Sequence, residues 1–273
     1  MNIGGLEQTM GNGVTTGQGE RMAATIAIAG TDTDAGKTIV TAAIAAYWLR
    51  HGGRRSLGLL KPVQSGIGDR ERYHQWFGAQ VDQTAESINP LWFEAPLAPP
   101  IAAQREGKSI DLAVAWRSLG ALQRSRDLVL VEGAGGLGSP VTWELTVADV
   151  FYEWRLPTVL VVPVKLGAIA AAVANVALAR QVGVNLRGMV LNCTAPRSAQ
   201  EIADLAPADL LTTLTGVPVL GCIPHLADLE TGDRPALGTT LAAAAANLDL
   251  ERLLGAALRP GPTPLGALTG ANA

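Results

Sequence analysis

The sequence predicts a doubly wound α/β fold, in which helices flank a mainly parallel β-sheet. Short, almost wholly apolar segments alternate with longer segments that suit helices, which is typical of repeated strand–helix units. The short segments lack an apolar–polar alternation, as strands covered on both faces of a parallel sheet do. The chain has 273 residues, of which 48% are hydrophobic, so a sizeable core can form.

The elements are expected in a regular order along the chain. The predicted strands are residues 25–29, 56–60, 128–131, 158–162, 186–191 and 218–222. The predicted helices are residues 37–50, 112–124, 147–154, 169–181 and 199–215. Residues 65–104 are less regular and rich in proline and aromatic residues, so they either lie over the active face or cover a sheet edge.

Composition sets the domain organisation and excludes some functions. We expect a disordered extension at residues 1–22, a single α/β domain at 23–258 and a flexible tail at 259–273. The net charge of −3, without a basic cluster, argues against nucleic acid or an anionic membrane as the main partner. Cys193 and Cys222 lie in or beside apolar runs and are expected to be buried thiols. With no signal-peptide core and no apolar run of membrane length, a cytoplasmic location is expected.

The turn at residues 30–38 joins the first strand to the first helix. Backbone N–H groups and a helix N-terminus then point at one spot, which favours an anion. Lys37 adds a positive charge for phosphate oxygens, and the Thr38 hydroxyl stands where a Mg²⁺ ligand is expected. The turn therefore predicts a nucleoside triphosphate site with magnesium, although the loop is one residue longer than usual and carries Asp32 and Asp34. The alternative is a capped helix start with a solvated lysine.

Polar residues follow several predicted strands, at the edge where ligands bind in this fold. Glu132 ends the strand 128–131 before a glycine-rich turn and could orient a metal. Lys61 ends the second strand, where a second ammonium suits a reaction that builds negative charge. Asp69 could be a metal ligand or a helix N-cap, and Asn192 could contact a purine edge. The alternatives are a surface residue at a turn for Glu132 and a solvated side chain for Lys61.

Taken together, these motifs closely resemble dethiobiotin synthetase. The resemblance is carried, in order and at the family's spacing, by residues 30–38, 61–66, 131–136, 164–167 and 221–224. It implies a P-loop NTPase fold, a homodimer and an ATP-dependent cyclo-ligase of biotin biosynthesis. Such an enzyme uses ATP, Mg²⁺ and CO₂ to carboxylate 7,8-diaminopelargonic acid. It closes the ureido ring through a carbamic-phosphoric anhydride and releases ADP and phosphate.

The resemblance also implies roles for individual residues. Lys37 and Lys61 would be catalytic, and Mg²⁺ would be held by Thr38, Asp69 and Glu132. Substrate would be bound by Ser65, Lys165 and Gly167, the last two across the dimer interface. ATP would be bound by Asp34, Ala35, Gly36, Lys37, Thr38, Ile39, Asp69, Glu132, Gly133, Ala134, Gly135, Asn192, Cys193, Pro224, His225 and Leu226. Pro100 and Ala170 depart from the family pattern and leave the contacts of the substrate tail unassigned.

Two other functions remain as alternatives. A partitioning or regulatory ATPase with a deviant phosphate loop would carry an additional lysine early in the loop, where residues 29–32 are Ala-Gly-Thr-Asp. An amide-forming relative from cobalamin biosynthesis would add a large glutamine-hydrolysing domain, for which we expect no room in this chain. Substrate-dependent ATP turnover would distinguish a synthetase from a nucleotide switch.

Overall fold

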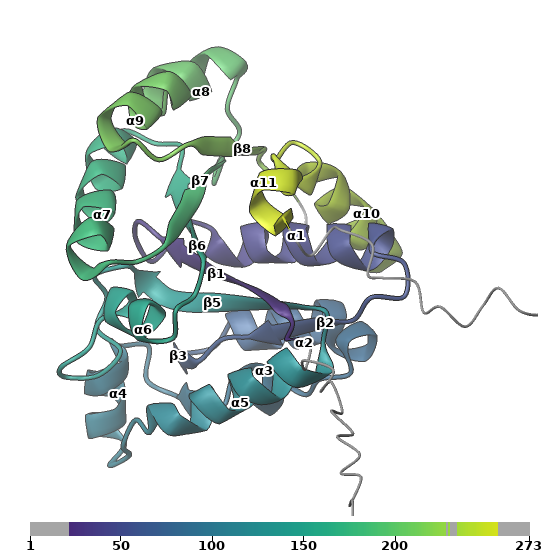
Figure 1. The fold of residues 1–273 in the computed structure, drawn as a ribbon, viewed down its shortest axis with the longest axis vertical. Coiled ribbons are helices and arrows are strands. Elements are labelled where there is room, and N and C mark those ends of the chain that lie inside the picture. The colour runs from purple at the N-terminus through teal and green to yellow at the C-terminus, as the bar shows by residue number, and fades with distance from the viewer. Residues whose placement is uncertain (1–21, 228, 230–233, 256–273) are drawn as a thin grey trace, which may run out of the picture.

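A central parallel sheet with helices on both faces forms the body of the molecule (Figure 1). The computed structural model describes residues 22–227, 229 and 234–255. The predictions for residues 1–21 and 256–273 therefore lie outside the described residues. The six strands of the main sheet are β1 (Ala24–Gly30), β2 (Leu57–Leu60), β5 (Leu128–Gly136), β6 (Thr158–Pro163), β7 (Leu186–Asn192) and β8 (Val219–Ile223).

The order of the strands confirms the doubly wound fold. It runs β2-β5-β1-β6-β7-β8, and every paired neighbour is parallel. Each predicted strand corresponds to one of the six, with shifts at the ends. Because β1 lies inside the sheet between β5 and β6, the loop after β1 opens at the middle of the carboxyl edge.

Helices cover both faces, and alternate residues of the strands point into two separate cores. Ile26 and Ile28 of β1 face one core, while Ala27 and Ala29 face the other. The helices are α1 (Lys37–His51), α2 (Asp69–Val81), α3 (Ala85–Ile88), α4 (Pro99–Arg105), α5 (Leu112–Ser125), α6 (Val147–Glu153), α7 (Ala168–Val182), α8 (Ala199–Leu205), α9 (Ala208–Thr215), α10 (Arg234–Ala245) and α11 (Leu250–Leu254). Core residues of α1, α2 and α10 belong to the first core, and those of α5, α6 and α7 to the second.

Several segments differ from the sequence prediction, and the short helix α11 is among those not predicted. The expected helix 199–215 is two helices, because Pro207 lacks an N–H and disfavours the helical region at Ala206, whose φ is −144°. The stretch 65–104 is more regular than expected, since it contains α2, α3 and α4. It also contains β4 (Leu91–Phe93), which pairs with β3 (Val63–Ser65). The alanine-rich helix α10 was not predicted, and it packs beside α1 (Figure 1).

The aromatic residues of the 65–104 stretch are divided between two places. Trp76 and Phe77 of α2 are buried in the core that α2 shares with α1. Trp92 of β4 instead donates its indole N–H to the carbonyl of Gly66, 2.9 Å away, while the Arg70 guanidinium lies 4.2 Å from its ring centre. The stretch therefore supplies both core packing and a fixed loop at the carboxyl edge. Among the described residues, no helix is long and apolar enough to cross a membrane.

Candidate active site

The turn between β1 and α1 brings backbone and side-chain donors to one point. Gly36 has φ 85°, a left-handed conformation that glycine adopts readily, and it stands at the N-cap of α1. A Cβ atom at this position would lie 2.0 Å from Nδ2 of Asn192. Asn192 donates that amide to the carbonyl of Ala35, 3.1 Å away, and so supports the turn from β7. The β1–α1 turn is therefore fixed by a side chain from the end of strand β7.

Lys37 is buried rather than solvated. Only 4% of the residue is exposed, and its Nζ donates to the carbonyl of Thr33 at 2.9 Å and of Asp32 at 3.2 Å. Burial lowers the pKa of Lys37, although the negative charge of Glu132 partly opposes this. The phosphate loop thus curls around an ammonium group, as a site for phosphate oxygens requires.

Sheet register brings Lys61 and Glu132 together. Leu60 of β2 pairs with Val131 of β5, so the next residue on each strand, Lys61 and Glu132, lies side by side on the face toward α1 and α2. Lys61 Nζ is 2.6 Å from Glu132 Oε1 and also forms an ion pair with Asp69. Glu132 lies within β5 rather than at its end, because the strand continues to Gly136.

Thr38 completes the cluster from the first turn of α1. Its Oγ1 is 2.8 Å from Asp69 Oδ1 and 3.2 Å from Glu132 Oε1. The predicted metal-binding set, Thr38, Asp69 and Glu132, is therefore one group of neighbouring oxygens. Asp69 is the first residue of α2, and its carboxylate is engaged by Lys61 and Thr38.

The charges of this cluster stabilise one another. Burial disfavours the Lys61 ammonium, but attraction to Glu132 and Asp69 outweighs burial and raises the pKa of Lys61. Burial likewise opposes ionisation of Asp69, but Lys61 outweighs it and holds the pKa of Asp69 below its ordinary value. Buried ion pairs contribute little net stability, since desolvation offsets their attraction. Such a cluster in a cleft is more typical of a functional site.

A cleft of about 810 Å³ lies over the cluster. The predicted residues Asp34, Gly36, Lys37, Thr38 and Ile39 line it from the β1–α1 side, and Lys61, Ser65, Asp69, Ala134 and Gly135 line it from the β2 and β5 side. Ala35 is buried beneath the loop, Gly133 against α6 and Glu132 behind Lys61 and Thr38, so none of these three lines the cleft. Ser65 Oγ is buried without a hydrogen-bond partner and is thus available to a ligand.

The remaining predicted residues do not line this cleft. Cys193 and Asn192 stand at the end of β7, beside Pro224, His225 and Leu226, which follow β8. Lys165 and Gly167 are exposed in the segment before α7 and do not line the cleft. Cys193 is buried and Cys222 partly buried; both are free thiols, 3.7 Å apart at sulfur.

Tyr73 also belongs to this cluster, although it was not among the predicted residues. Its hydroxyl forms a hydrogen bond with Glu132 Oε2, and Thr41 Oγ1 lies 3.4 Å from the same oxygen. Tyr73 is four residues after Asp69, so both side chains lie on one face of α2. A prediction of helix 69–81 would have provided this signal, because the i, i+4 spacing would then have been visible.

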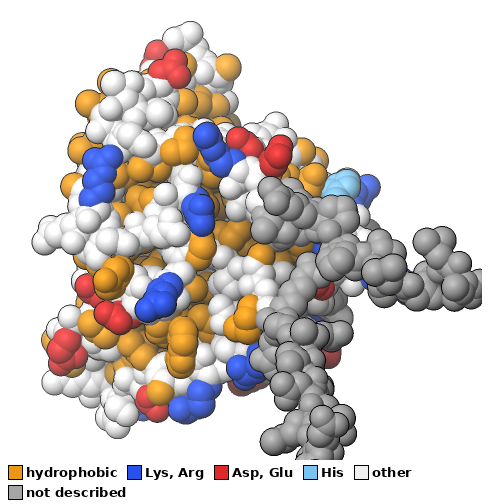
Figure 2. All heavy atoms as spheres, viewed as in Figure 1, with side chains coloured by type: hydrophobic (Ala, Val, Ile, Leu, Met, Phe, Trp, Pro, Cys, Tyr) orange, Lys and Arg blue, Asp and Glu red, His pale blue; other side chains and the backbone are white. Residues whose placement is uncertain are grey.

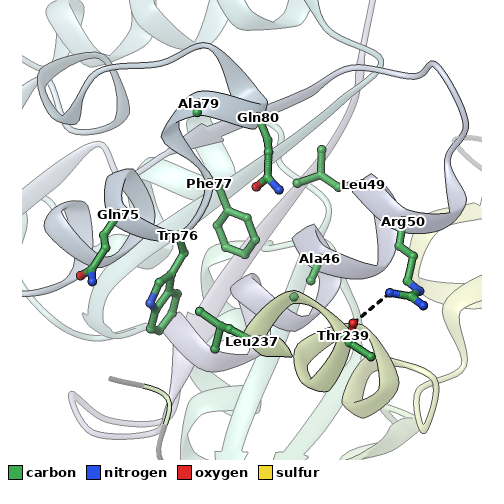
Figure 3. A pocket seen from close by; sticks show the side chains of 11 residues that line it. Ala46, Leu49, Arg50, Gln75, Trp76, Phe77, Ala79, Gln80, Leu237 and Thr239 are labelled. Atoms are coloured by element: carbon green, nitrogen blue, oxygen red, sulfur yellow. Dashed lines mark hydrogen bonds between the residues drawn. The ribbon is translucent and has the colours of Figure 1, made fainter. Parts of the chain in front are cut away.

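A second hollow lies between α1, α2 and α10 (Figure 3). Its volume is about 480 Å³, and none of the predicted site residues lines it. Leu49, Trp76, Phe77 and Leu237 give it apolar walls, and Arg50 donates to the Thr239 hydroxyl at 3.0 Å. This hollow lacks the carboxylates of the cleft.

Known proteins resemble the chain in sequence and in fold. A family model described as an AAA domain matches residues 24–232. The ATP-dependent dethiobiotin synthetase of Gloeothece citriformis is 53% identical over 231 residues, which cover 85% of this chain and 99% of the relative. That of Crocosphaera subtropica is 53% identical over 229 residues, covering 84% and 99%. Among solved structures, a ParA family ATPase from Chlorobium tepidum matches 88% of this chain and 99% of its own. The match has a TM-score of 0.52 at 15% identity, so the likeness is one of fold alone.

Proposed function

The chain belongs to the family of ATP-dependent dethiobiotin synthetases, and from this premise we propose how its residues carry out the reaction. The protein is an ATP-dependent cyclo-ligase of biotin biosynthesis. We propose that ATP, CO₂ and 7,8-diaminopelargonic acid meet in the cleft over Lys37, Lys61 and Glu132. The observation that carries this proposal is the joint burial of two ammonium groups and one carboxylate at the end of the phosphate loop.

The proposed chemistry needs positioning and positive charge more than proton transfer. One amine of the substrate adds to CO₂ and loses a proton, giving a carbamate. A carbamate oxygen attacks the γ-phosphorus, so that a carbamic-phosphoric anhydride forms and ADP leaves. The second amine then attacks the carbonyl carbon, loses a proton and expels phosphate as the ring closes.

We propose that the ammonium groups of Lys37 and Lys61 bind the phosphoryl oxygens of ATP. Lys37 is held within the β1–α1 turn, and Lys61 lines the same cleft. Preorganised positive charge in such a desolvated site is worth most where negative charge develops during transfer. Ser65 has a buried hydroxyl without a partner in the wall of the cleft, which supports its proposed contact with the substrate. Asn192 and residues 224–226 are proposed to lie along the adenine base, beyond the ends of β7 and β8.

The residues present fit a magnesium ion. Thr38, Asp69 and Glu132 offer oxygen ligands only, which Mg²⁺ prefers, and their oxygens already gather within hydrogen-bond distance of Thr38. We propose that these three residues hold the ion. When bound, Mg²⁺ supplies positive charge that neutralises the phosphate oxygens. Lys61, which here bridges the two carboxylates, would then also be available to the reacting groups.

We propose that the active enzyme is a homodimer. Leu166, Trp143 and Tyr152 are large apolar residues with 89%, 66% and 50% exposure. Apolar side chains also gather over the region of α6 and α7 on the face that Figure 2 shows. Exposed apolar surface of this kind marks interaction sites. Burial of this surface against a second copy would carry Lys165 and Gly167 toward the partner's cleft. We further propose that the enzyme works in the cytoplasm, which suits its two neighbouring free thiols.

The direct test of function is phosphate release with and without the diamine and bicarbonate. We expect ATP turnover to require both, with dethiobiotin as the product. Turnover that ignores the diamine would instead support a nucleotide switch.

The dimer proposal has its own test in subunit mixing. Lys61→Ala and Lys165→Ala homodimers should each be weak enzymes. After exchange, a mixed dimer would have one site with both lysines and one with neither, so the mixed dimers should recover about half of the wild-type activity. Exchange verified by mass spectrometry without any recovery would contradict a contribution of Lys165 in trans.

A further inference from the structure

Tyr73 places a phenol against the back of the Glu132 carboxylate. Its hydroxyl forms a hydrogen bond with Glu132 Oε2, and only 1% of either residue is exposed. We propose that Tyr73 is a positioning residue, whose hydroxyl holds Glu132 so that Oε1 faces the reacting groups. This inference rests on the proposed function, because it assigns Glu132 to the metal and phosphate site.

The two oxygens of Glu132 have different partners. Oε1 contacts two residues that line the cleft, with Lys61 Nζ at 2.6 Å and Thr38 Oγ1 at 3.2 Å. Oε2 faces the α1–α2 interface, with the Tyr73 hydroxyl and, at 3.4 Å, Thr41 Oγ1. The terminal torsion of a glutamate has a broad minimum, so the carboxylate can turn unless its partners hold it. The hydrogen bond from the phenol to Oε2 restricts this rotation and thereby fixes the direction of Oε1.

The phenol is the donor in this hydrogen bond, because a carboxylate can only accept. Burial, and then the negative charge of Glu132, raises the pKa of Tyr73 well above its usual value. The hydroxyl therefore keeps its proton and donates to the carboxylate. A buried phenol without a partner would be costly, so the ring position and the hydrogen bond favour the same arrangement.

The hydroxyl is separable from the packing role of the ring. Tyr73 lies in the same core as Trp76, Phe77 and Val81, which are the other large buried side chains of α2. A phenylalanine would fill nearly the same volume. Loss of the oxygen alone would leave Glu132 Oε2 with only the distant Thr41 hydroxyl.

Helix α2 thereby controls two groups of the site. Asp69 begins the helix and Tyr73 follows one turn later. One helix therefore positions both Asp69, a proposed metal ligand, and Tyr73, which bonds the proposed ligand Glu132. The start of α2 is itself held, because Gln64 Oε1 accepts the backbone N–H of Arg70 at 2.9 Å. Partners behind metal ligands commonly change metal affinity or activity by about 10–100-fold when removed.

The test is Tyr73→Phe, measured by binding as well as by turnover. Mn²⁺ is titrated into protein saturated with ADP, and free Mn²⁺ is followed by electron paramagnetic resonance. We expect the Mn²⁺ dissociation constant to rise about tenfold and the Mg²⁺ concentration for half-maximal turnover to rise with it. The KM for ATP at saturating Mg²⁺ should change little. If the wild-type protein fails to bind Mn²⁺ with ADP, the proposed metal site is wrong. If wild type and variant bind Mn²⁺ equally, the inference about Tyr73 is wrong.

A double-mutant cycle separates positioning from packing. If Tyr73 acts through Glu132, Tyr73→Phe should cost nothing further in a Glu132→Gln background, whereas independent effects would add. Phe77→Leu is the matched control, because it alters a buried ring on the same helix that has no polar group to bond Glu132. It should lower the melting temperature and leave Mn²⁺ binding unchanged. Additive losses in the cycle, or an equal Mn²⁺ defect in Phe77→Leu, would overturn the proposal.

Discussion

The cleft and the second hollow share two walls, yet only one of them has the chemistry of an active site. Both are bounded by α1 and α2, and the cleft lies at the N-terminal ends of these helices. The hollow lies further along them, where α10 forms its third wall (Figure 3). Thr38 and Arg50 mark the two places on α1; they are 12 positions apart in this helix, or about 18 Å. The cleft has a volume of about 810 Å³ and the hollow about 480 Å³, so both are large enough for a ligand.

The difference between them comes from the polarity of helices and strands. Helix N-termini offer unpaired N–H groups and positive potential, and parallel strands end at the same edge, so the cleft collects donors and strand-end side chains. At the other end of α1 the basic side chains Arg50 and His51 complement the helix dipole. Concavity alone therefore does not identify the site. We expect substitutions in the cleft to change turnover, and those in the hollow to change stability.

The largest expected effect is that of Lys37→Ala. Its loss removes an ammonium from the transferring phosphoryl group, which is worth on the order of several kcal/mol of transition-state stabilisation. Diamine-dependent phosphate release should become undetectable while circular dichroism stays that of the wild type. Arg50→Ala, which removes a charge from the same helix at the hollow, is the control and should keep wild-type turnover. Comparable loss in both variants would contradict the division between the two regions.

Lys61→Met should affect both turnover and stability. The variant leaves Glu132 without its buried cation, and breaking a buried pair from one side costs about 3–5 kcal/mol. Thermal unfolding in a chelator should show a strongly lowered melting temperature, and added Mg²⁺ should restore part of it. Restoration is expected because the proposed metal site places positive charge among the same carboxylates. A melting temperature that ignores Mg²⁺ would count against this site.

Phe77→Ala should lower the free energy of unfolding and leave the turnover number unchanged. The ring is buried beside the hollow, and truncation of a buried phenylalanine costs about 3–5 kcal/mol. Urea unfolding should show the loss of free energy, while the turnover number of the folded fraction stays close to that of the wild type. A fall in turnover per folded molecule would show that the hollow is coupled to the cleft.

Gly238→Ala should have the smallest effect, and a favourable one. Gly238 lies inside α10 and lines the hollow, and an added Cβ would meet no atom within 4 Å. Replacement of a helical glycine by alanine is worth about 0.5–1 kcal/mol. The melting temperature should rise slightly, with unchanged kinetics. A lower melting temperature would contradict the expectation that a methyl group at position 238 fits in the hollow without a clash.

The local pattern of apolar residues was sufficient to predict the strands of the main sheet. Each predicted strand is present, because buried parallel strands require continuous apolar runs that are visible in the sequence. The turn at 30–38 was also visible, since glycine and the Lys37-Thr38 pair are local features. Helices 199–215 and 234–245 were harder: Pro207 divides the first, and the alanine-rich second, α10, shows little amphipathic pattern.

The amino-acid sequence by itself determined the six strands of the main sheet, the phosphate loop and the residue types of the site. Only the tertiary structure decided which charges meet. The pairing of Leu60 with Val131 sets Lys61 beside Glu132, and residues far apart in sequence acquire this register only when the sheet forms. Likewise Tyr73 reaches Glu132 because α2 packs on α1 across the same core. Periodicity describes one element at a time, whereas these contacts depend on how several elements pack together.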